Sequence, residues 1–141
     1  MGTPLQSLYD RFQTKVNEDL TGKESLIFAL VDVAISKSYK TATHSLTYVV
    51  DPPIPPATVS YSGFFDEDLD LDEIELLALW MVYEWDRREQ QRLVKQRRDI
   101  GTTDFNRLEG KKEQLQVVET AMKTTLSDIR DLVDSMNTYI Y

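Results

Sequence analysis

The stretch from Asp66 to Asp99 constrains the fold of this 141-residue chain more than any other, because its pattern predicts one long helix. It contains neither glycine nor proline, and Asp70 followed three residues later by Glu73 forms a capping box that predicts Asp70 as the N-cap. About 30 helical residues, each rising roughly 1.5 Å, make a rod of roughly 45 Å. A compact domain of this size has a radius of gyration of about 14 Å. We therefore expect the helix to project beyond its own core and to present a surface for protein interaction.

The middle and the end of this helix differ in chemistry. Residues 74–85 are apolar on nearly every face, which predicts burial, and their aromatic side chains are expected in a core or a subunit interface rather than in a platform for stacking bases. The segment that follows is rich in bases, namely Arg87, Arg88, Arg92, Lys95, Arg97 and Arg98. These cations suit the C-terminal end of a helix dipole, and they also suit a contact to phosphates or to an acidic protein surface. The acidic start of the same helix in a second copy is one such surface, and both interpretations stay open.

Three further helices are predicted around the long one. Pro4 is expected at the first helical position of an amphipathic helix, and Thr21 with Glu24 forms a second capping box for an apolar helix over residues 22–37. After a turn with Gly101 as its cap, a last helix is predicted over residues 104–138. Its apolar seam has near-heptad spacing, with Thr125 at one polar position: Leu115, Val118, Met122, Ile129, Leu132 and Met136. This seam predicts antiparallel packing against the long helix.

Residues 38–63 have a different character, with one acid, one base and four of the five prolines. Proline fixes φ and removes a donor, so the segment Pro52, Pro53, Ile54, Pro55 and Pro56 is expected to be extended. The flanks at 45–50 and 58–61 are predicted as short strands. The chain is thus predicted to be one mainly α domain over residues 1–141, a helical bundle with two long antiparallel helices, two shorter N-terminal helices and an extended arm or β-hairpin.

The sequence offers no pattern typical of an enzyme or of a cofactor site. Without cysteine there is no disulfide, thiolate nucleophile or cysteine metal site. The acidic run that begins at Asp66 fails as a calcium loop, because its sixth and twelfth positions are Leu71 and Leu77. His44 is the single histidine and has no nucleophile motif beside it, so we expect no catalytic role. The net charge of −8 argues against wrapping DNA over a broad surface, and no stretch predicts a signal peptide or a membrane span.

Several short stretches outside residues 38–63 recur together in one known family. They are residues 7–12 (Ser-Leu-Tyr-Asp-Arg-Phe), Ala34 with Ile35, then Phe65, Asp68, Leu69, Glu75, Leu77, Ala78, Met81, Val82, Glu84 and Trp85, followed by Asp104 with Phe105 and the closing Tyr139, Ile140 and Tyr141. In this order they resemble the head–tail connector, or neck adaptor, proteins of tailed bacteriophages that infect Gram-positive bacteria. The match consists of structural residues spread over the chain, not of a chemical motif.

The resemblance implies a non-enzymatic virion protein of the neck that is assembled in the host cytoplasm. Such proteins form a homo-oligomeric ring, commonly of twelve copies, between the portal protein and an adjacent neck or tail-completion protein. The ring extends the DNA channel without sequence-specific DNA binding. We expect the segments 52–56 and 139–141 to contact neighbouring subunits or the portal, and the bases from Arg87 to Arg98 to form a charged contact surface. The alternative is a small helical regulator that binds nucleic acid through these bases.

Overall fold

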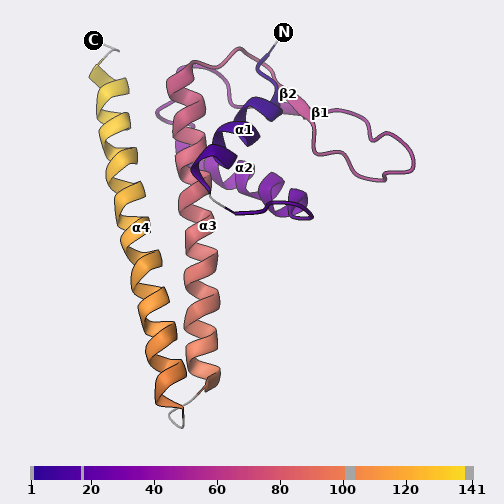
Figure 1. Ribbon diagram of the computed structural model, residues 1–141. Helices are drawn as coiled ribbons and strands as arrows, with labels where there is room; N and C mark the ends of the chain where they lie inside the picture. Colours follow the sequence, from indigo (N-terminus) through magenta and orange to yellow (C-terminus); the bar gives the residue numbers. More distant parts are fainter. Residues whose placement is uncertain (1, 17, 101–103, 139–141) are drawn as a thin grey trace.

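The computed structural model describes residues 2–16, 18–100 and 104–138, and these are mainly helical, as the sequence predicts (Figure 1). The elements in chain order are α1 (Leu5–Lys15), α2 (Glu24–Ser38), β1 (Tyr48–Val50), β2 (Gly63–Phe65), α3 (Leu71–Ile100) and α4 (Phe105–Thr138). Within the described residues, no helix combines the length and the apolar character that crossing a membrane requires.

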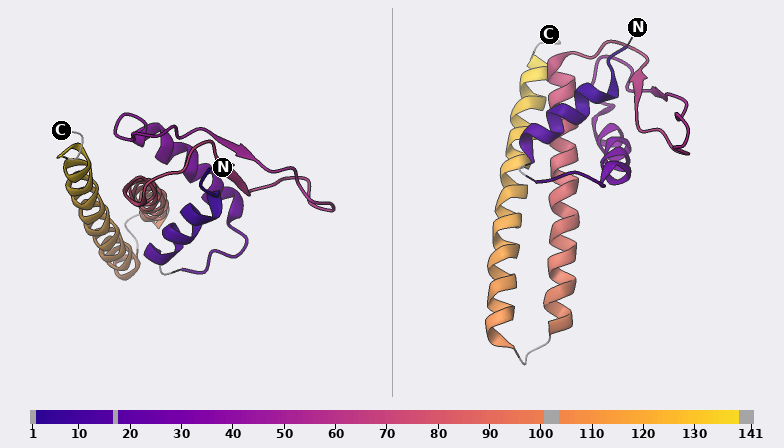
Figure 2. Two further views of the ribbon diagram at one scale, coloured as in Figure 1. Left: turned by 90° about the horizontal axis from the view of Figure 1, so that it is seen from above. Right: turned by 45° about the vertical axis from the view of Figure 1, so that its right-hand side comes forward.

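Helix α3 is the element against which the other helices pack. Its start is fixed as predicted, because the Asp70 N–H donates a hydrogen bond to Glu73 Oε1 over 3.0 Å, which is one half of a capping box. Both α1 and α2 pack against the first half of α3, and α4 packs along α3 from the other side (Figure 2). The predicted burial of the middle of α3 is confirmed for Leu76, Leu77, Ala78, Leu79 and Met81.

The main core lies between α1, α2, β2 and the first half of α3. Its most buried side chains are apolar residues at helical spacing, which is why the segments form helices: Leu5, Leu8 and Phe12 of α1, Leu30, Val31 and Ala34 of α2, and Leu77, Ala78 and Met81 of α3. Two ion pairs join α1 to α3, because Arg11 and Lys15 both contact the carboxylate of Glu75. We call α1, α2, the two strands and residues 71–86 of α3 the head.

Helices α3 and α4 form the predicted antiparallel hairpin. The seam of α4 is buried at Leu115, Met122, Thr125, Ile129 and Met136, and half-buried at Val118 and Leu132. Asp104 caps the start of α4, where its Oδ1 accepts the Arg107 N–H over 3.1 Å. The half of the hairpin that contains the turn extends past α1 and α2, which confirms that the long helix projects beyond its core (Figures 1 and 2).

Two predicted helix starts are wrong in detail. Helix α2 begins at Glu24 with Lys23 as its N-cap and without a side-chain cap, so Thr21 does not cap it. The reason is local, because Gly22 adopts a positive φ of 79° and separates Thr21 from the helix by a turn. At α1, Pro4 is the N-cap and not the first helical residue, because its extended backbone (φ −66°, ψ 143°) forms a bridge to Phe64.

The two strands also differ from the prediction. The first lies within the predicted 45–50, but the second is β2 and not 58–61, and it pairs antiparallel with β1 in the register Val50 opposite Gly63. Gly63 fits there because a Cβ atom would lie 2.1 Å from the Val49 carbonyl oxygen. Phe65 N–H donates to the Thr3 carbonyl oxygen over 2.8 Å, so the chain start lies beside β2. The predicted turn residue Gly101 and the predicted docked segment 139–141 lie outside the described residues.

Candidate interaction surfaces

The proline-rich segment forms an arm that leaves the head. We use the name arm for residues 51–62, which project from the ends of β1 and β2 away from α3 (Figure 1). Its base is closed by the Asp51 N–H, which donates to the Ser62 carbonyl oxygen over 2.8 Å. At its tip, the predicted contact residues are exposed, and Ile54 is 81% exposed: Pro52, Pro53, Ile54, Pro55 and Pro56. An apolar, proline-rich tip is therefore available to a partner.

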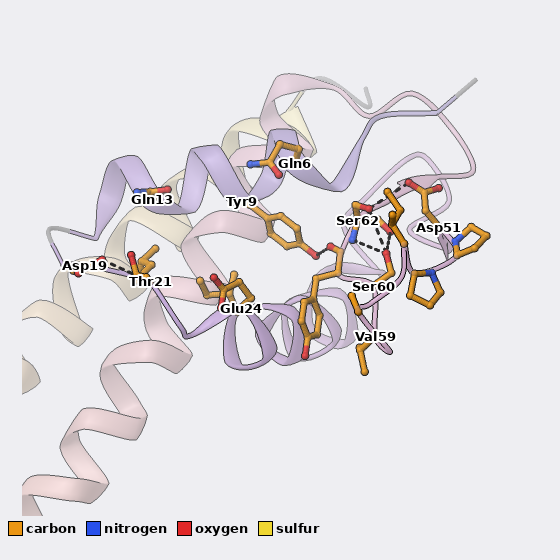
Figure 3. A pocket seen from close by; sticks show the side chains of 17 residues that line it. Gln6, Tyr9, Gln13, Asp19, Thr21, Glu24, Asp51, Val59, Ser60 and Ser62 are labelled. Atoms are coloured by element: carbon orange, nitrogen blue, oxygen red, sulfur yellow. Dashed lines mark hydrogen bonds between the residues drawn. The ribbon is translucent and has the colours of Figure 1, made fainter.

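A pocket of about 640 Å³ lies where the arm faces α1 and the start of α2 (Figure 3). Its apolar wall includes Tyr9 and Ile27, and the Tyr9 hydroxyl donates to the Tyr61 carbonyl oxygen over 2.6 Å, which joins α1 to the arm. Three carboxylates also line it: Asp19, Glu24 and Asp51. We call this cavity the acidic pocket.

The three carboxylates of the acidic pocket accept hydrogen bonds but form no ion pair within the described part of the chain. Asp19 Oδ1 accepts the Thr21 N–H over 3.0 Å, and hydrogen bonds from the Thr21 hydroxyl and N–H lower the pKa of Asp19. The nearest lysine along the chain, Lys23, places its ammonium 5.3 Å from the Trp85 ring centroid. The pocket therefore presents three carboxylates that are not paired with a base of the described part of the chain.

The opposite end of the molecule is basic. We call residues 92–112 the basic end; they hold seven bases and three acids, a net charge of +4, whereas the other 120 residues hold nine bases and 21 acids, a net charge of −12. Of the six predicted contact bases, Arg87 is paired with Glu84 and Arg92 with Glu89 within α3. The other four are exposed and have no carboxylate within ion-pair distance among the described residues: Arg88, Lys95, Arg97 and Arg98.

The third charged group lies at the start of α3, around the single histidine. His44 Nδ1 lies 2.6 Å from Glu73 Oε1, and the His44 N–H donates to Glu73 Oε2 over 3.1 Å. Asp70 Oδ2 lies 3.9 Å from the same imidazole nitrogen, so the three side chains have the composition of a metal site. Both oxygens of the buried Glu73 carboxylate already accept hydrogen bonds, and these bonds hold residue 44 against α3.

The neighbours of His44 can be compared with the arrangement of a catalytic triad. Thr43 Oγ1 lies 3.3 Å from His44 Nδ1, the nitrogen that also faces Glu73. A nucleophile–histidine–carboxylate triad uses the two imidazole nitrogens separately, one for each partner. Thr43, His44 and Glu73 are therefore not arranged as a triad.

Sequence reasoning identified the arm and the basic part of α3 but missed the acidic pocket and the partner of His44. The pocket combines residues of four separate segments, and Asp19, Glu24 and Asp51 have no common spacing. His44 and Glu73 are 29 positions apart, and no pattern joins them. The expected contacts of 139–141 lie outside the described residues.

Comparisons of the chain with protein-family models, curated proteins and solved structures found no match.

Proposed function

We propose that this protein is a structural subunit of the ring that joins the portal to the tail of a tailed bacteriophage and extends the DNA channel. The sequence resemblance suggests this role, and the observation that carries the proposal is the long α3–α4 hairpin that extends past the head (Figure 1). The arm leaves the head in a different direction, so each molecule has two projections around one small core. Such a shape offers two different contact surfaces, and head-to-tail contacts between identical subunits can close into a ring.

The charge distribution is compatible with a channel that DNA passes through. The chain carries a net charge of −8, so a ring of copies has few means of gripping phosphates over a broad surface. Few phosphate contacts mean weak binding that salt reverses easily. The four exposed bases Arg88, Lys95, Arg97 and Arg98 are then used for protein contacts.

The test is the mass of the protein in solution, measured by light scattering and native mass spectrometry, alone and with a matching portal. We expect either a closed ring, commonly of twelve copies, or a monomer that becomes a ring on the portal. A monomer or dimer that ignores the portal at every concentration would contradict the proposal. A variant without the tip, with Gly-Ser-Gly in place of residues 52–56, is expected to fold and to lose portal binding or ring formation.

A second function is favoured by the net charge of +4 at the basic end, which suits a small regulator that binds nucleic acid. Binding of this kind would show as affinity for duplex DNA that falls steeply between about 50 and 200 mM salt. The double variant Arg97→Glu/Arg98→Glu would abolish it, whereas Lys123→Glu/Arg130→Glu, with the same charge change on the exposed face of α4, would not. A chain that stays monomeric and binds DNA in this way would replace the ring proposal by this one.

A further inference from the structure

The acidic pocket has three carboxylates, and none of them lies within ion-pair distance of a base among the described residues, while the charge of Lys23 contributes to the lowered pKa of Asp19. Glu24 Oε1 accepts the Gly22 N–H over 3.4 Å, and Asp51 Oδ2 accepts the Ser62 hydroxyl over 3.4 Å, so both carboxylates are held in place by weak neutral donors. In Figure 3, Glu24 lies between Asp19, which is beside Thr21, and Asp51, which is beside Ser62 at the base of the arm. A volume of about 640 Å³ is within the range of pockets that bind ligands or several side chains.

The pocket walls suit a long cationic side chain. Tyr9, Ile27 and Tyr61 provide apolar surface beside the carboxylates. Arginine and lysine bury their methylene stems against apolar surface while their charged ends meet an acceptor. A ligand with several such side chains on a rigid element fits this combination better than a neutral or an anionic ligand.

The bases of α1, of α2 and of the residues next to α2 already have partners in this part of the molecule. Arg11 and Lys15 pair with Glu75, while the ammonium groups of Lys23, Lys37 and Lys40 lie 5.3, 5.2 and 5.9 Å from aromatic ring centroids. The basic end differs in this respect. Its exposed bases Lys95, Arg97, Arg98 and Lys112 have no carboxylate within ion-pair distance among the described residues.

The basic end cannot reach the pocket of its own chain, because it lies at the far end of the hairpin from the head (Figures 1 and 2). We infer that the acidic pocket binds the basic end of a second copy of this chain. This inference rests on the proposed ring and names its subunit contact: the pocket of one copy receives Arg97 and Arg98 of the next. The contact is heterologous, so an open row of copies keeps one free pocket at one end and one free basic end at the other until the ring closes.

Complementary charge reversal tests this contact. The pocket variant Glu24→Lys/Asp51→Lys and the end variant Arg97→Glu/Arg98→Glu are each expected to stay monomeric under conditions in which the unaltered protein assembles. In an equimolar mixture, the basic pocket of the first variant can bind the acidic end of the second, and the acidic pocket of the second can bind the basic end of the first. The two variants can then alternate around a ring, so assembly is expected to return. The control Lys123→Glu/Arg130→Glu is expected to assemble as the unaltered protein does, and circular dichroism checks that each variant is folded.

A second readout locates the contact directly. The chain has no cysteine, so Glu24→Cys and Arg98→Cys introduced into separate molecules can join only to each other or to their own kind. Oxidation of the mixture is expected to give mainly the mixed dimer, and a mixture of Glu24→Cys with Lys123→Cys is expected not to.

The outcomes separate the inference from the function on which it rests. Assembly of both charge-reversed variants on their own would overturn the pocket contact and leave the ring intact. Loss of assembly without rescue in the mixture would also overturn it, because the basic end would then bind another surface, such as the portal. Failure of the unaltered protein to assemble, alone or with the portal, would overturn the ring and the contact together.

Discussion

At the scale of single residues, the pair of His44 and Glu73 links protonation to the packing of the head. The hydrogen bond to Glu73, and then its charge, raise the pKa of His44 above 6.5. Burial raises the pKa of Glu73, but hydrogen bonds from Asp70 and His44 outweigh burial and lower it below 4.5. The raised pKa of His44 contributes stability that is complete below about pH 6.5, the ordinary pKa of histidine. This stability is lost as the pH rises through the raised pKa of the folded protein. The lowered pKa of Glu73 contributes stability that is lost as the pH falls through it, so the pair is strongest in mildly acidic solution.

The single histidine makes this measurable, because one imidazole signal appears in the NMR spectrum. We expect the titration midpoint of His44 to lie above 6.5 in the folded protein and to return toward that value in Glu73→Gln. Asp131→Asn, which removes an exposed carboxylate of α4, is the control and leaves the midpoint unchanged. An unshifted midpoint in the unaltered protein would show that the pair does not form.

A matched pair of leucines in α3 tests the core. Leu77 is fully buried in the head, whereas Leu71 at the start of the same helix is 85% exposed. Leu77→Ala removes buried methyl groups and leaves a cavity, so we expect a loss of about 3 kcal/mol in the free energy of unfolding. Leu71→Ala is expected to change it by less than about 0.5 kcal/mol. Urea unfolding measures both, and equal costs would contradict the described packing.

Two glycines give opposite predictions for the same substitution. A Cβ at Gly110 meets nothing within 4 Å, and the residue lies inside α4, so Gly110→Ala is expected to stabilise by about 0.5–1 kcal/mol through helix propensity. At Gly63 a Cβ would lie 2.1 Å from a backbone oxygen, so Gly63→Ala is expected to destabilise. Urea midpoints that move in the same direction for both would contradict this difference.

At the scale of elements, the two ends of the hairpin differ in how many other elements pack against them. The part of α3 in the head contacts α1, α2 and α4, whereas the part beyond Leu93 packs against α4 alone among the described elements. Local opening is easiest where few buried contacts hold a segment. We expect amide hydrogen exchange to be slowest in residues 74–84 and fastest toward residues 96–100 and 105–112.

Leu93 is the buried residue that should hold the free part of the hairpin together, since it is 1% exposed there. Leu93→Ala is expected to speed exchange of the surrounding amides about tenfold or more, which corresponds to at least about 1.4 kcal/mol of local stability. Exchange in α1 and α2 is expected to stay as it was. Faster exchange throughout the head would show that the hairpin and the head open as one unit.

The elements also show what the sequence could predict. Helix α3 and the seam of α4 follow from local rules, because a capping box, an uninterrupted helical run and heptad spacing act within one segment. The site of β2 could not be read from β propensity, which favours residues 58–61, because the close approach of Gly63 to Val49 and the hydrogen bond of Phe65 to Thr3 decide it. The acidic pocket escaped prediction for the same reason, since only the tertiary fold brings Glu24 near Asp51.

At the scale of the whole molecule, the charge is separated along the long axis. The basic end carries +4 and the remaining 120 residues −12, so the molecule has a strong permanent dipole. Two such molecules attract when the basic end of one approaches the head of the other, and they repel when equal ends meet. Added salt screens this attraction within about 10 Å at 0.1 M, so we expect any assembly through the acidic pocket to weaken as ionic strength rises.

The shared use of α3 has a consequence for how the chain folds. The hydrogen bond from the Leu69 N–H to the Thr3 hydroxyl closes a span of 66 positions, and the contact of Arg11 with Glu75 closes one of 64. During synthesis the segments of α1 and α2 leave the ribosome first, yet the apolar surface that they cover is made only later. The hairpin, in contrast, can form outward from its turn through contacts between near neighbours in sequence. The first half of the chain therefore cannot pack until α3 has been synthesised. Before that, the apolar stripes of α1 and α2 are exposed, and a chaperone would bind there.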